Sequence, residues 1–99
     1  MVFNNHVLGM VRQLQYHYVG QRYNGVHFSK TVDFMMLAKA YGAAGYQITS
    51  KEEAPEILKE AFNNGRFSII EIAVDPDDLC LPIVLGGHAL DDMVLAPEA

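Results

Sequence analysis

The stretch FSIIEIAV, residues Phe67 to Val74, decides the fold of this 99-residue chain. Its isoleucines and valine make a near-continuous β-branched run, which is typical of a strand covered on both faces in a parallel sheet. Asp75 and Pro76 then end the strand with turn residues. The stretch therefore predicts a buried strand with other elements packed on both of its sides.

A helix and a short strand are predicted directly before it. The apolar residues of segment 54–62 recur with the 3.6-residue period of a helix, and Ser50 to Glu53 has the sequence of a capping box at its start. Gly45 to Thr49 alternates between apolar and polar residues as a half-buried strand does.

An earlier helix is predicted to begin at a cap supplied by Thr31 or Asp33 and to stop at Gly42. The order helix, strand, helix, strand is that of a doubly wound α/β domain. Crossovers of this length make the two strands parallel.

The N-terminal part adds a short strand and a helix. Val2 and Phe3 look like a buried strand that has lost its beginning, and an apolar stripe predicts a helix from Met10 to Tyr18 that ends at Gly20. Residues 21–30 and the C-terminal tail are predicted to be irregular. We therefore expect residues 1–99 to be a single truncated α/β domain, with a partial doubly wound parallel sheet and flanking helices.

Composition excludes several classes of function. The net charge is −5 and the basic residues are scattered, which argues against nucleic-acid binding. No apolar run reaches the roughly 18 residues of a membrane span. Cys80 is the only cysteine, which is compatible with a reducing compartment, and its expected role is packing. No signal peptide is visible, so we expect a cytoplasmic protein.

Common chemical motifs are missing. The four histidines show no pair at the spacing that places two ring nitrogens on one helical face for zinc, and neither a P-loop nor a G-x-G-x-x-G sequence is present. The acidic cluster Asp75, Asp77 and Asp78 is interpreted as a solvated turn. Asn4 and Asn5 remain, at the C-terminal end of a strand, where open α/β sheets bind ligands. An Asn pair there is more ordinarily a turn device.

The segment NNHVLGMVRQ, Asn4 to Gln13, resembles the downstream half of the thiamine-diphosphate motif in its acetolactate synthase version, Asn-Asn-x-x-x-Gly-Met-Val-x-Gln. The resemblance continues through Asp33-Phe34, the helix start at Ser50 and the strand end at Val74 to Leu90-Asp91-x-Met93, and so covers nearly the whole chain. It implies the C-terminal portion of a thiamine-diphosphate-binding domain.

The resemblance also implies a set of site residues. The side-chain oxygen of Asn5 and the backbone carbonyl of Val7 would be Mg²⁺ ligands, as suits this hard cation. Leu8, Gly9 and Met10 would pass along the cofactor. Met10 and Leu14 would line the substrate channel, and Leu14 stands where many family members have Trp.

In the parent enzyme the resemblance implies decarboxylation of pyruvate and its ligation to a second 2-ketoacid, in branched-chain amino-acid synthesis. It leaves a regulatory subunit open as a further partner. The family's Gly-Asp-Gly, whose Asp is the third metal ligand, is absent from the 99 residues, and the activating glutamate belongs to another domain. No catalytic residue is assigned, and we expect this chain alone to be inactive and to bind neither thiamine diphosphate nor Mg²⁺.

Two alternatives stay open. Another thiamine-diphosphate enzyme, such as an oxalyl-CoA or sulfopyruvate decarboxylase, could share the Asn-Asn segment. The chain could also be a non-catalytic remnant that folds by self-association, because Val2-Phe3 and the strand at 67–74 would otherwise expose apolar surface. In either case we expect a dimer or a larger homo-oligomer.

Overall fold

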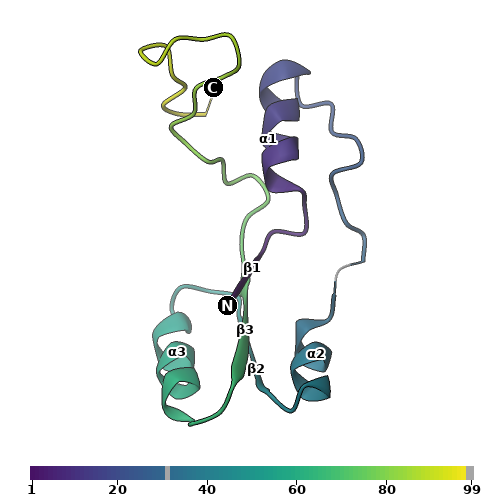
Figure 1. Cartoon of the computed structure of the whole chain (residues 1–99), viewed down its shortest axis with the longest axis vertical. Coiled ribbons are helices and arrows are strands. Elements are labelled where there is room, and N and C mark those ends of the chain that lie inside the picture. The colour runs from purple at the N-terminus through teal and green to yellow at the C-terminus, as the bar shows by residue number, and fades with distance from the viewer. Residues whose placement is uncertain (31, 98–99) are drawn as a thin grey trace. The chain divides into compact units, whose positions relative to one another are not determined.

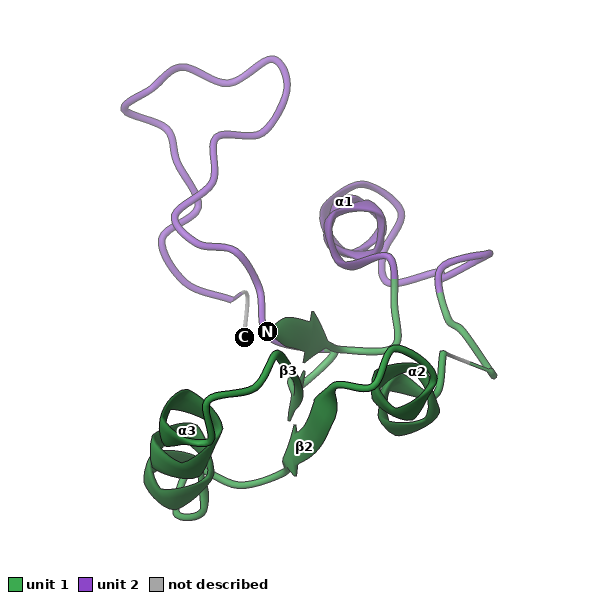
Figure 2. Ribbon diagram, turned by 60° about the horizontal axis from the view of Figure 1, so that its bottom comes forward, with its two compact units in different colours: residues 1–7, 27–76 green, residues 8–26, 77–99 purple. Residues whose placement is uncertain are grey.

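A computed structural model of the chain describes residues 1–30 and 32–97, so Thr31, one of the two predicted caps, lies outside the described residues. The chain forms two compact units (Figure 2). The first comprises residues 1–7 and 27–76, and the second comprises residues 8–26 and the segment that begins at residue 77. In the described part of the chain, every helix is too short or too polar to cross a membrane.

The first unit is built on a parallel sheet. Its strands are β1 (Val2–Asn4), β2 (Ala44–Ile48) and β3 (Ser68–Ala73), in the order β1-β3-β2. Both pairings are parallel, as predicted for β2 and β3. The β-branched strand is the central one because only there can both of its edges and both of its faces be covered.

Two helices cover the sheet from opposite sides (Figure 1): α2 (Phe34–Ala40) and α3 (Ala54–Asn63). The α/β fold class and both helices are therefore confirmed. The apolar core lies under α3, where Ile48 and Ile70 of the sheet pack against Ala61, all of them less than 10% exposed.

On the other face, α2 approaches the sheet closely at Gly45. A Cβ atom at this position would lie 3.1 Å from the Cβ of Ala38 and 3.2 Å from the sulfur of Met35. The predicted cap is confirmed at Asp33, whose Oδ1 accepts a hydrogen bond of 2.9 Å from the backbone N–H of Met36. Gly42, at the predicted stop, has a φ of +67°.

The start of α3 is held by the carboxylate of Glu53. Its Oε1 accepts hydrogen bonds from the backbone N–H and the hydroxyl of Thr49 and from the backbone N–H of Ser50. This is the carboxylate half of the predicted capping box, while the regular helix begins only at Ala54. The bonds from Thr49, and then that from Ser50, hold the pKa of Glu53 below its usual range.

The second unit contains α1 (Gly9–Tyr18) and the C-terminal segment. The helix is confirmed, but its buried residues are polar: Arg12 and Gln13 are 7% and 3% exposed. Its apolar stripe, Val11, Leu14 and Tyr18, is exposed.

Residues 77–97 of the C-terminal segment are irregular, as predicted, apart from one antiparallel bridge between Ile83 and Val94. The expectation that Cys80 is a packing residue is wrong, because this residue is exposed. The structural role of Cys80 lies in its backbone, whose carbonyl and N–H both form hydrogen bonds with the side chain of Gln13.

Candidate cofactor-binding segment

The Asn pair forms a turn at the C-terminal end of β1, within the first unit. The Oδ1 atom of Asn4 accepts a hydrogen bond of 3.1 Å from the N–H of His6, and the Oδ1 atom of Asn5 accepts one of 3.2 Å from the N–H of Val7. Each amide bonds the backbone two residues on, so the pair does act as the turn device that Asn ordinarily provides.

His6, between the two proposed ligands, has a left-handed backbone with a φ of +57°. For a residue with a side chain this conformation costs about 1 kcal/mol, so contacts from outside must hold it. The N–H of His6 is bonded to Asn4, and its carbonyl accepts a hydrogen bond of 3.0 Å from the N–H of Phe28. The turn is thus fixed on both sides of its strained residue.

The oxygens of this turn fit a hard cation. The amide oxygen of Asn5 uses one lone pair for the Val7 N–H and keeps the other. The carbonyl of Val7 accepts no backbone hydrogen bond from the described residues. Residues 1–30 and 32–97 hold no cluster of three or more His, Cys, Asp or Glu that could bind a metal ion. Amide and carbonyl oxygens are themselves ligands that hard cations accept.

Behind the turn lies a polar cluster that the sequence interpretation missed. Glu71 of β3 is only 9% exposed, and its two carboxylate oxygens accept hydrogen bonds from the side-chain amides of Asn4 (2.6 Å) and Gln47 (3.2 Å). An open pocket of about 420 Å³ lies beside it, lined in part by His6, Gln47 and Glu71. The sequence did contain a sign of this cluster, because an acidic residue such as Glu71 is unusual inside an otherwise apolar strand.

Leu8, Gly9 and Met10 belong to the second unit and form the start of α1. Leu8 is the N-cap residue, and its side chain makes no capping hydrogen bond. A helix N-terminus suits an anionic ligand because the first N–H groups of a helix have no acceptor within the helix. Leu8, Met10 and Leu14 are 44%, 51% and 40% exposed, so their side chains are accessible to a ligand.

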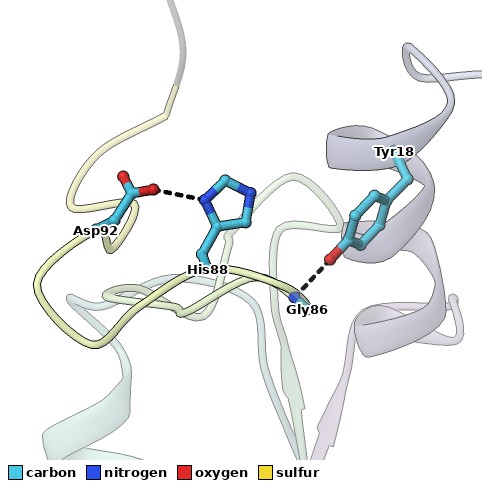
Figure 3. A network of polar contacts seen from close by, with 4 residues as sticks. All are labelled: Tyr18, Gly86, His88 and Asp92. Carbon is cyan, nitrogen blue, oxygen red and sulfur yellow. Dashed lines mark hydrogen bonds and ion pairs between the residues drawn. The ribbon is translucent and has the colours of Figure 1, made fainter.

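The rest of the second unit is held by polar contacts around α1. Arg12 forms an ion pair of 2.5 Å with Asp77, and its guanidinium lies 4.0 Å from the centre of the Tyr23 ring. Figure 3 shows a further tether, in which the hydroxyl of Tyr18 accepts a hydrogen bond of 2.6 Å from the N–H of Gly86. The figure also shows the pair formed by His88 and Asp92, 2.7 Å apart.

An open parallel sheet with a polar turn at a strand's carboxyl end defines a ligand-binding α/β protein. The sequence matches the family described as thiamine pyrophosphate enzyme, C-terminal TPP binding domain, over residues 1–72. The chain belongs to this family.

Its curated relatives include acetolactate synthase large subunits. A probable one from Methanocaldococcus jannaschii is 40% identical over 93 residues, which are 94% of this chain and 16% of the relative. The subunit from Haemophilus influenzae is 33% identical over 94% of this chain and 16% of its own length. That of Escherichia coli isozyme 3 is 33% identical, with 94% and 17% covered. The chain thus spans about one-sixth of the length of the relatives it matches.

Proposed function

We propose that this chain forms the part of an acetolactate synthase that holds the Mg²⁺ and diphosphate end of thiamine diphosphate. The observation that carries the proposal is the turn at residues 4–7, at the end of a parallel strand, where the Asn5 amide oxygen accepts one hydrogen bond from Val7 and the Val7 carbonyl accepts no backbone hydrogen bond from the described residues. The likeness to acetolactate synthase large subunits along 94% of the chain supports the synthase over the decarboxylases.

In this proposal Asn5 and Val7 hold the Mg²⁺, and Leu8, Gly9 and Met10 contact the cofactor. Met10 and Leu14 shape the channel through which the 2-ketoacid substrates approach. When bound, thiamine diphosphate supplies the electron sink that decarboxylation of pyruvate requires. The residues of this chain bind and orient it.

The 99 residues contain two of the proposed protein ligands and no Gly-Asp-Gly. Because Mg²⁺ demands near-octahedral oxygen coordination, we expect no turnover and no cofactor binding by these residues alone. Isothermal titration of the chain with thiamine diphosphate and Mg²⁺ together should give no saturable heat. Saturable, Mg²⁺-dependent binding would contradict this incompleteness.

A hybrid enzyme tests the function itself. The chain replaces the matching segment of the Methanocaldococcus jannaschii relative, and acetolactate formation from pyruvate is measured as Mg²⁺ is titrated at saturating thiamine diphosphate. We expect an active, Mg²⁺-dependent hybrid in which Asn5→Ala raises the half-saturating Mg²⁺ concentration at least about tenfold. Asn63→Ala, on α3, is the matched control and should change nothing. A folded but inactive hybrid would contradict the proposal.

Self-association is a further part of the proposal. Phe3, Phe62 and Phe67 of the first unit are 69–74% exposed, an unusual exposure for large apolar side chains. We expect a dimer or larger species in light scattering, and a monodisperse 11.0 kDa monomer would contradict this. The regulatory subunit and the cytoplasmic location stay predictions.

A further inference from the structure

Glu71 is the one buried carboxylate at the end of the sheet that carries the Asn turn, among the residues that the structure describes. It lies on the central strand, paired in register with Gln47 of β2 and two residues before Ala73, the partner of Asn4 on β1. Among the described residues no basic side chain forms an ion pair with it. Its partners are instead two neutral amides, one from each neighbouring strand.

A continuous set of hydrogen bonds leads from this carboxylate to the metal-binding turn. Gln47 and Asn4 donate to Glu71, and the other end of the Asn4 amide, Oδ1, accepts the N–H of His6. The donation to Glu71 fixes which way the Asn4 amide points, because only its NH₂ end can face the carboxylate. Asn4 must then present its oxygen to His6, the left-handed residue between Asn5 and Val7.

We propose that Glu71 is a positioning residue for the metal ligands: through Asn4 it holds the His6 backbone and thereby sets the Asn5 and Val7 oxygens in place. This inference rests on the proposed function of the turn. A carboxylate suits the role because it offers two acceptors and no donor, so it orients an amide on either side. A glutamine offers one oxygen and one NH₂, which must face one of the two donating amides.

The test uses Glu71→Gln, which keeps the shape of the side chain, and Asn4→Ala, which removes the link without altering the buried strand. Ile70→Val, beside Glu71 on β3 and 5% exposed, is the structural control, since it loosens packing and touches neither amide. In the 99-residue chain, amide hydrogen exchange is measured at His6 and Val7. In the hybrid enzyme, the half-saturating Mg²⁺ concentration and kcat at saturating Mg²⁺ are measured.

We expect Glu71→Gln and Asn4→Ala to speed exchange at His6 and Val7 relative to the other strand-end amides. Both should raise half-saturating Mg²⁺ about tenfold with kcat at saturation little changed, while Ile70→Val leaves both local readouts at their original values. If Glu71→Gln only lowers stability, as Ile70→Val does, the positioning role is overturned. If Asn5→Ala also leaves the Mg²⁺ dependence unchanged, Asn5 is no ligand, and the proposed function fails together with this inference.

Discussion

Gln13 holds both backbone groups of Cys80, 67 positions away in the sequence. Its Nε2 donates to the Cys80 carbonyl at 2.9 Å, and its Oε1 accepts from the Cys80 N–H at 2.8 Å. Gln13 is 3% exposed, so the carboxamide is committed to this contact. The side chain of Gln13 thus joins α1 to the C-terminal segment by pairing with the N–H and the C=O of one residue, as the backbone of a neighbouring β-strand does.

Replacing Gln13 with Ala should release this segment. Two hydrogen bonds of about 1 kcal/mol each are lost, partly offset by water at the exposed Cys80, so we expect a loss of about 1–2 kcal/mol in local stability. Native-state hydrogen exchange at the Cys80 amide measures it. Gln15→Ala is a matched control, because Gln15 makes the same pair of bonds to the backbone of Asn24. Faster exchange at Cys80 in both variants would contradict the assignment.

Tyr18→Phe should loosen the turn around Gly86. The variant keeps the ring on α1 and removes only the oxygen that accepts the Gly86 N–H, at a cost of about 1 kcal/mol. Exchange at the Gly86 amide should become faster. Tyr41→Phe, which alters a tyrosine that is 75% exposed in the first unit, should leave Gly86 unchanged. Equal protection of Gly86 in Tyr18→Phe and the original chain would show that the tether holds nothing.

Glu53 should make the stability of the chain depend on pH. The hydrogen bonds from Thr49 and then that from Ser50 hold the pKa of Glu53 in the folded chain below the ordinary glutamate value of 4.5. The stability that the ionised Glu53 adds to the folded chain is therefore fully present above that value, and it is lost as the pH falls through the folded pKa. Urea unfolding at pH 7 and at successively lower pH measures it: Glu53→Gln should lose less stability on acidification than the original chain. Glu52→Gln, on the same turn, is the control. If Glu53→Gln loses as much unfolding free energy on acidification as the original chain, this role of Glu53 is contradicted.

His17→Phe should stabilise the chain. Both ring nitrogens of His17 are inaccessible to solvent and have no hydrogen-bond partner among the described residues. Phe has a similar shape and keeps the edge contact with Tyr16. It removes two buried unsatisfied polar atoms, so we expect the free energy of unfolding to rise by about 1–2 kcal/mol. Chemical denaturation measures the gain. His88→Phe, which instead removes a paired ring, should give none. A less stable His17→Phe chain would show that the ring nitrogens are satisfied in solution.

The sequence by itself determined the elements and their class. The β-branched run at 67–74, the cap at Asp33 and the stop at Gly42 each act within a few residues, so local chemistry is enough to reveal them. The parallel sheet followed from the order of these elements. The turn at Asn4 and Asn5 was likewise predictable, because each Asn bonds a backbone group only two residues away.

Tertiary structure decided the rest. The apolar stripe of α1 did not predict its buried residues, because Arg12 is buried through Asp77 and Gln13 through Cys80, partners more than 60 positions away. The role of Glu71 depends in the same way on Asn4, 67 positions away on another strand. The spacing of apolar residues along a helix predicts only which of its apolar side chains can be buried together on one face. Arg12, Gln13 and Glu71 are buried where distant partners satisfy their hydrogen bonds, and only the folded chain brings those partners together.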